Sequence, residues 1–97
     1  MLEPPTIKNL RRKAHHLKPL VLVGQSGVTS GVLAALEETL IVHELVKVRL
    51  RIRDRAERKK AILLLAEAVN AEIINKIGST VVFFRRNPES KIDWSKE

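Results

Sequence analysis

The sequence predicts a single α/β domain with the order α-β-α-β-α-β-β and a four-stranded mixed sheet. Three patterns support this prediction. Apolar residues recur at helical steps in three segments, apolar and basic residues alternate strictly over 46–53, and Gly78-Ser79 separates two β-favouring runs. Because strand-helix-strand crossovers give parallel pairs and a hairpin gives an antiparallel pair, the sheet should be mixed. With 97 residues, 44% of them hydrophobic, we expect one domain over 1–97, with a core at about 6–88 and a tail over 89–97.

The first predicted helix covers residues 6–17, with Thr6 as its expected N-cap. Its buried face should consist of the apolar residues that recur at steps of three and four: Ile7, Leu10, Ala14 and Leu17. The helix must end by Lys18, because the residue before Pro19 is pushed out of the α region. Residues 20–23 are all apolar, which favours a strand buried on both faces.

A short loop, Gly24-Gln25-Ser26-Gly27, follows this strand. Because glycine adds no side chain and tolerates positive φ, a G-x-x-G loop can bring its backbone close to that of a nucleic acid. A plain strand-to-helix turn is the alternative, since paired glycines are common in turns. The second predicted helix starts at Thr29 or Ser30 and runs to about Val42. It should point Glu37 and Glu38 outward and bury Val32, Leu33, Leu36 and Leu40.

Residues 46–53 alternate without interruption between apolar side chains and four cations, Lys47, Arg49, Arg51 and Arg53. A period of two over this length predicts a strand with one buried face. The cations would lie roughly 6.5 to 7 Å apart along the other face. Like charges in a row are unfavourable unless an anionic partner balances them, although a solvated charged face remains the alternative.

The remaining elements are a helix over 55–69, capped by Asp54, and a hairpin of strands over 71–77 and 80–86. The apolar stripe of this helix should comprise Ala61, Ile62, Leu64, Leu65, Ala68 and Val69. Phe83 and Phe84 are adjacent on a strand, so at most one of them can be exposed. The tail should be loosely ordered unless Trp94 packs on the domain.

The net charge of +7 lies in two separate blocks. Residues 1–18 contain five basic residues and one acidic residue, and residues 47–60 contain eight basic and two acidic residues. Residues 19–46 contain three acidic residues and no basic residue, and residues 61–97 are balanced. Two basic blocks suggest an anionic partner, and in the predicted fold they could converge around the glycine loop.

Several functional classes are disfavoured by composition. Cysteine is absent, which excludes disulfides and thiolate chemistry and fits a reducing compartment. The first residues lack the pattern of a secretory signal and no apolar run could span a membrane, so we expect a cytoplasmic protein. We expect neither metal nor cofactor: His15 and His16 diverge by about 100° around their helix and His43 lies on another.

Catalytic motifs are incomplete as well. Ser26 resembles part of a nucleophile elbow, but Val28 occupies the position of the final glycine. The loop also lacks the lysine of a phosphate-binding P-loop. The sequence therefore predicts no catalytic residues and no small-molecule substrate.

Four linked motifs occur in order and without insertion over residues 6–88: Ala14-His15-His16-Leu17-Lys18-Pro19, Val23-Gly24-Gln25-Ser26-Gly27, His43-Glu44-Leu45-Val46-Lys47-Val48, and Ile77-Gly78 before an apolar strand. In these motifs the chain resembles the CRM domain, the RNA-binding module of chloroplast splicing and ribosome maturation proteins. It resembles most closely the bacterial single-domain, YhbY-like form. This family is associated with large-subunit ribosomal precursor particles in bacteria and with intron splicing in organelles.

The resemblance implies a fold similar to the C-terminal domain of translation initiation factor three, with the glycine loop used on RNA much as in KH domains. It also implies a basic surface on the first helix, around Arg11, Arg12, Lys13 and His15. Relatives often carry a Lys or Arg inside the loop, whereas this chain has Gln25-Ser26. The donors in the loop would then be backbone N–H groups, the Ser26 hydroxyl and the Gln25 amide.

These observations together predict a monomeric, non-catalytic protein that binds structured ribosomal RNA during large-subunit assembly, mainly through phosphates and shape. The predicted RNA-binding residues are Gly24, Gln25, Ser26, Gly27, Lys8, Arg11, Arg12, Lys13, His15, Lys18, Lys47, Arg49, Arg51 and Arg53. The alternative is a protein-interaction module that docks on ribosomal proteins or assembly factors through its acidic second helix and Trp94. His15 or His16 could also pack against the first strand instead of binding phosphate.

Overall fold

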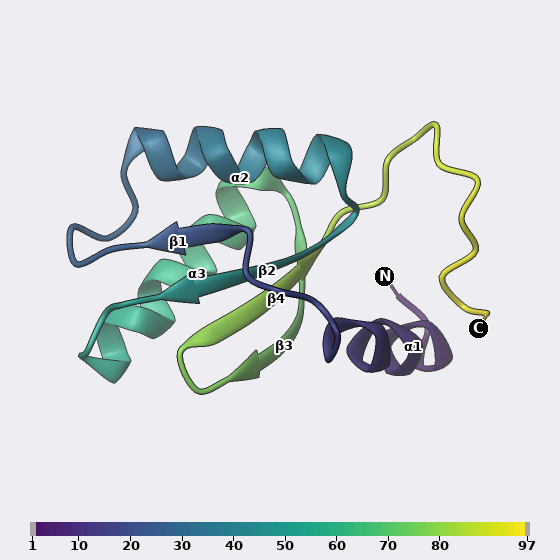
Figure 1. Cartoon of the computed structure of the whole chain (residues 1–97), viewed down its shortest axis with the longest axis horizontal. Helices are drawn as coiled ribbons and strands as arrows, with labels where there is room; N and C mark the ends of the chain where they lie inside the picture. The colour runs from purple at the N-terminus through teal and green to yellow at the C-terminus, as the bar shows by residue number, and fades with distance from the viewer. Residues whose placement is uncertain (1, 97) are drawn as a thin grey trace.

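The computed structural model describes residues 2–96 and has the element order that the sequence predicts (Figure 1). The helices and strands are α1 (Pro4–Ala14), β1 (Val21–Val23), α2 (Ser30–Val42), β2 (Leu45–Leu50), α3 (Arg55–Val69), β3 (Glu72–Ile77) and β4 (Thr80–Phe84). The strands form one sheet in the order β1-β2-β4-β3, in which β1 and β2 are parallel and the other two pairs antiparallel. The prediction of a four-stranded mixed sheet is therefore confirmed, and the radius of gyration is 12.9 Å.

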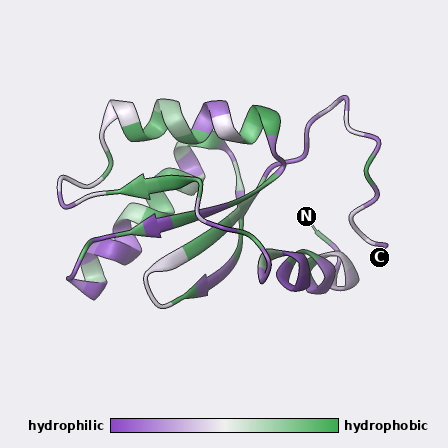
Figure 2. Cartoon of the chain, in the orientation of Figure 1, coloured by the Kyte–Doolittle hydropathy of each residue, from purple (hydrophilic) through white to green (hydrophobic). Residues whose placement is uncertain are grey.

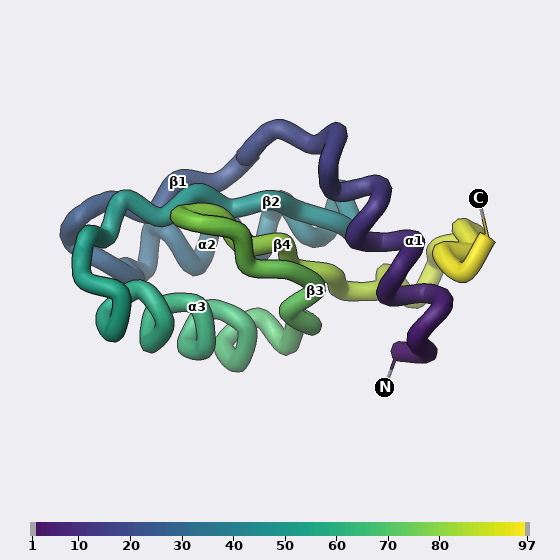
Figure 3. The backbone as a smooth tube through the Cα atoms, turned by 90° about the horizontal axis from the view of Figure 1, so that it is seen from below, coloured from purple at the N-terminus to yellow at the C-terminus, as the bar shows by residue number. Residues whose placement is uncertain are grey.

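The two faces of the sheet are covered unequally. Helices α2 and α3 pack on one face, where residues such as Val48 and Phe83 are fully buried. Helix α1 covers only one end of the other face, where Leu10 and Ala14 pack with Phe84. Figures 1 and 3 show α1 at one end of the molecule and the loop after β1 at the other. Part of the second face, along β1 and β2, is consequently open.

Three expectations for the N-terminal segment were wrong: the start of the first helix, its end, which is Ala14 rather than Leu17, and the burial of the first strand. The helix begins at Pro4, because the proline ring pre-forms the first turn, and Glu3 rather than Thr6 is its N-cap. Strand β1 is not buried on both faces: Val21 and Val23 are buried, but Leu22 is 51% exposed. β1 lies at the edge of the sheet, on the side that α1 leaves open.

The predicted strand over 46–53 ends at Leu50 instead. Its neighbours end at the same level, since Val23 is paired with Leu50 and Thr80 with Arg49. Two further hydrogen bonds hold the chain beyond that point, from Leu50 N–H to Ser79 O at 2.7 Å and from Arg51 N–H to Val23 O at 2.8 Å. The alternation nevertheless predicted the buried face correctly, because Val46, Val48 and Leu50 are at most 1% exposed.

Helix α3 has the predicted bounds and the predicted cap. Asp54 Oδ1 accepts hydrogen bonds from the backbone N–H groups of Ala56 at 2.8 Å and Glu57 at 3.4 Å. The predicted stripe was partly wrong, because Leu64 is 54% exposed and Ala68 is also exposed. The buried face is narrower and consists of Ala61, Ile62, Leu65 and Val69.

The second predicted helix is also confirmed, with Thr29 as its cap. Glu37, however, does not simply point into solvent. Its two carboxylate oxygens accept hydrogen bonds from Arg85 Nη1 at 2.7 Å and Nη2 at 2.8 Å. This contact lowers the pKa of Glu37, against a smaller opposing effect of desolvation, and raises that of Arg85. Arg85 also donates to Val69 O at 3.0 Å, so it joins α2 to the end of α3.

The C-terminal tail is docked on the domain through a buried carboxylate. Glu44, 8% exposed, accepts hydrogen bonds from Asn87 N–H at 2.6 Å, Ser90 Oγ at 2.6 Å and Trp94 Nε1 at 3.0 Å. The Trp94 ring meets Phe84 edge to face at 5.7 Å between centroids. The tail therefore covers the α1 side of the core, where Phe84 is buried, while Phe83 is buried on the opposite face under α2 and α3.

Candidate nucleic-acid interface

The glycine loop forms a closed turn at one end of the sheet. Gly27 N–H donates to Gly24 O at 3.0 Å, and Gly27 has a φ of +77°, which favours glycine. A Cβ added at Gly24 would meet no heavy atom within 4 Å. Gln25 and Ser26, at the tip of the turn, are exposed. The turn is thus open to approach from outside, with one of its N–H groups already used inside it.

A row of basic side chains runs from β2 to this loop. Arg49 lies on the open face of β2, and Arg51 and Arg53 follow beyond the end of the strand. All three are exposed, and together with Gln25 they line one shallow depression of about 450 Å³. We call Arg49, Arg51 and Arg53 the basic row. The structure therefore brings the glycine loop and the second basic block together, as the sequence predicted.

A further arginine, absent from the predicted site, completes this depression. Arg58 in the first turn of α3 donates from Nη1 to Ile52 O at 2.9 Å and lines the same depression. Figure 2 shows the hydrophilic colour on β2 and on the first turns of α3, beside the apolar colour of β1. The sequence pattern that could have pointed to Arg58 is the placement of cations in the first turns of α3, which is unfavourable with respect to the helix dipole.

The first basic block lies elsewhere. Helix α1 is at the end of the sheet opposite the loop (Figures 1 and 3), so the two blocks do not converge around the glycine turn. Lys8 and Lys18 are exposed there. Arg12 Nη2 donates to Asn9 Oδ1 at 3.0 Å, and Lys13 Nζ lies 5.9 Å from the centre of the Trp94 ring. Lys13 is therefore a neighbour of the docked tail.

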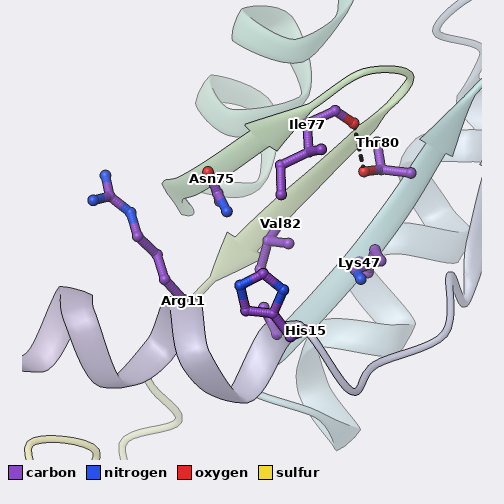
Figure 4. A pocket seen from close by; sticks show the side chains of 8 residues that line it. Arg11, His15, Lys47, Asn75, Ile77, Thr80 and Val82 are labelled. Atoms are coloured by element: carbon purple, nitrogen blue, oxygen red, sulfur yellow. Dashed lines mark hydrogen bonds between the residues drawn. The ribbon is translucent and has the colours of Figure 1, made fainter.

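Arg11 and His15 of the first block and Lys47 of the second line a small cavity where α1 meets the sheet (Figure 4). Its volume of about 20 Å³ suits no more than a water molecule. Arg11 Nε donates to Ile74 O at 3.0 Å and so helps to hold α1 against β3. His15 and His16 are both exposed, so neither packs into the core. Lys47, on the same face of β2 as Arg49, lies between α1 and the basic row.

Behind the loop, the structure shows a groove that the sequence did not predict. It has a volume of about 570 Å³ and lies between the turn and α3. Its lining includes Ile52, Glu57, Lys60 and Leu64. On α3, Glu57, Lys60, Ala61 and Leu64 recur at steps of three and four beside the buried stripe, which is the signal that could have revealed it.

Within residues 2–96, no three His, Cys, Asp or Glu side chains come together as a metal site requires. Over the same part of the chain, no helix is long and apolar enough to cross a membrane. The geometry of the described residues instead combines an exposed glycine turn with closely spaced cations. Such a surface suits an extended polyanion.

Comparison with known proteins identifies the family. The model of the CRS1 / YhbY (CRM) domain matches residues 2–85. The chain belongs to this family. This match confirms the resemblance to the CRM domain that the four sequence motifs indicated.

Relatives of this CRM domain include proteins from several bacteria. "Probable RNA-binding protein PA4753" of Pseudomonas aeruginosa is 37% identical over 82 residues, which cover 84% of this chain and 79% of that protein. "RNA-binding protein" of Haemophilus influenzae is 39% identical over 83 residues, which cover 86% of this chain and 84% of that protein. The solution structure of SAV1595 from Staphylococcus aureus matches with a TM-score of 0.81 at 30% identity, covering 94% of this chain and 95% of the other. Its fold is the fold described above.

Proposed function

We propose that this CRM domain is a non-catalytic RNA-binding protein that recognises structured ribosomal RNA during assembly of the large ribosomal subunit. The names of its relatives support RNA as the class of partner. The association of YhbY-like proteins with large-subunit precursor particles supports the choice of ribosomal RNA. The protein acts as a monomer in the cytoplasm.

The observation that carries this proposal is the shared depression of the glycine loop and the basic row. Gln25 and three arginines line it, and Arg58 adds a fourth guanidinium. Guanidinium groups are suited to phosphate oxygens because they offer several donors in a fixed plane. The turn lets the RNA backbone approach, and the arginines supply the counter-charge.

The RNA strand would run from the loop along the open face of β2 toward α1. Arg49 and Lys47 are alternate residues on that face, so they are separated by roughly 6.5 to 7 Å. Arg11, His15 and the exposed Lys8 and Lys18 would contact the far end of the same RNA. The residues predicted from sequence, apart from Lys13 beside Trp94, would then belong to one extended surface rather than to a compact site.

The features that could favour a protein partner have roles inside the domain. Trp94 donates a hydrogen bond to Glu44 and packs on Phe84, and Glu37 of the acidic helix α2 forms an ion pair with Arg85. Docking on a ribosomal protein would have to use other parts of these elements. The open, basic face of the sheet therefore favours RNA.

Crosslinking in cells, followed by sequencing of the bound RNA, tests the proposal. We expect the crosslinks to be enriched in large-subunit ribosomal RNA and its precursors, and to be lost in an Arg49→Ala/Arg51→Ala variant. Lys91→Ala, on the exposed tail, is the control substitution. Enrichment of unrelated RNA would contradict the ribosomal assignment. Protein partners that stay bound to the chain in a pull-down from a nuclease-treated lysate would favour a protein-docking function.

A further inference from the structure

The groove behind the glycine loop shares Arg53 with the basic row but otherwise has a different chemistry. Ser26 and Gly27 of the loop form one side, and α3 forms another. Its volume of about 570 Å³ lies within the range of pockets that hold small organic ligands. This groove, which is large enough for a small ligand, lies directly beside the depression that we assign to RNA phosphates.

Much of the groove lining is apolar. Val28 and Ile52 are partly buried and also pack against the main core. Ala61 is 7% exposed, and its short side chain leaves depth at that point. Leu64 lines the groove but is 54% exposed, so the core does not use most of its apolar surface. A flat heterocycle inserted here would bury apolar surface that water now contacts.

Carboxylates also line the groove. Asp54 contributes one, although its Oδ1 is engaged in capping α3. Glu57 contributes a second, and Lys60 Nζ lies 3.9 Å from its Oε1. Arg53 and Lys60 line the groove as well, so its two carboxylates are balanced by two cations, whereas the neighbouring depression has four arginines and no carboxylate. Carboxylates accept hydrogen bonds well from amino groups. The groove therefore offers carboxylate acceptors to an amino-bearing base, while the neighbouring basic row is complementary to phosphate.

We propose that this groove binds one unpaired nucleobase with an exocyclic amino group, turned out of the RNA strand whose phosphates follow the loop and the basic row. The inference rests on the proposed function and adds a base contact to it. The carboxylate of Glu57 accepts a hydrogen bond from the amino group, as acidic side chains do from cytosine N4. Leu64 and Val28 contact the ring. Uracil places a carbonyl oxygen where cytosine has its amino group, and a carboxylate repels it.

The test compares labelled oligo(C), oligo(U) and an abasic ribose-phosphate strand of equal length by fluorescence anisotropy with the full chain. We expect oligo(C) to bind at least about tenfold more tightly than oligo(U), within the range of a good base contact. Glu57→Gln should reduce this ratio severalfold, because the amide can also donate to uracil. Glu67→Gln, an exposed substitution on the same helix outside the groove, should not change it.

A second pair of variants tests the apolar wall. Leu64→Gln should weaken binding of oligo(C) but leave the abasic strand unaffected, whereas Leu63→Gln should change neither. Leu63 is 51% exposed and does not line the groove, so the two substitutions are closely matched. Because both leucines are exposed, both variants should fold, and circular dichroism checks this.

Two results would overturn the inference in distinguishable ways. Equal, salt-dependent binding of oligo(C), oligo(U) and the abasic strand would exclude a base contact and leave phosphate recognition intact. An absence of salt-dependent binding to any of the strands would reject the proposed function and the base contact with it.

Discussion

The backbone N–H of Gly27 donates to the carbonyl oxygen of Gly24 at 3.0 Å, and this bond closes the glycine loop into a turn. That N–H is already satisfied, so phosphate contacts from the loop must come from the exposed tip, Gln25 and Ser26. The two glycines consequently have different roles. Gly27 provides the conformation of the turn, and Gly24 provides open space beside the basic row.

Gly24→Asp should weaken RNA binding with little change in thermal stability. A side chain at Gly24 meets nothing within 4 Å, so the fold can accept it, but the added carboxylate repels phosphate. We expect roughly a tenfold loss in affinity, about the effect of 1.4 kcal/mol. Fluorescence anisotropy and a thermal melt measure the two properties. Ala35→Asp, exposed on α2, is the control for charge. A parallel fall in stability and binding would show that the loop acts as a structural turn.

Gly27→Ala should lower the free energy of unfolding by about 1 to 2 kcal/mol, because the residue must keep a left-handed conformation. Its φ is +77°, whereas Gly24→Ala introduces a methyl group into open space without this strain. Urea denaturation of the two variants separates these effects. Equal stability of both would contradict the conformational role assigned to Gly27.

Acidification should release the C-terminal tail. Burial opposes ionisation of Glu44, but hydrogen bonds from Ser90, Asn87 and Trp94 together outweigh it and lower its pKa below the ordinary 4.5. Because the folded pKa is lowered, the stabilisation is complete above pH 4.5 and is lost as the pH falls through the folded value. The chain has one tryptophan, so a red shift of its emission reports release of the tail.

Glu44→Gln provides the matching variant, since it keeps the size of the side chain and removes its charge. We expect the free energy of unfolding to fall by about 1 to 3 kcal/mol and the acid-dependent shift of Trp94 to disappear. An unchanged acid transition in this variant would assign the pH dependence to another group.

Much of the fold follows from local patterns. The alternation over 46–53 identified the buried face of β2, and Asp54 identified the start of α3, because each depends on neighbouring residues alone. The cations on the open face of β2 were recognised for the same reason. The second basic block and the glycine loop are close in sequence to the two paired strands β1 and β2, and the structure brings them together.

Apart from the start of α1, which Pro4 decides locally, the errors concern contacts between distant segments. The apolar face of α1 could pack on several parts of the sheet, and its actual position depends on Leu45, Phe84 and the tail. The exposure of Leu64 depends on where α3 lies relative to the loop. Its position among the apolar residues of α3 is compatible with a buried or an exposed side chain. The groove likewise arises only when the turn and α3 are placed side by side, so neither segment predicts it separately.

The central claim is that phosphates are bound along the basic row beside the glycine loop, and salt dependence tests it most directly. For five phosphates on single-stranded RNA, log K should fall with log[salt] at a slope of about −3.5. An Arg49→Ala/Arg51→Ala/Arg53→Ala variant should lose about three contacts and give a slope near −1.4. A flat salt dependence of the unmodified chain, or an unchanged slope in the folded variant, would contradict the claim.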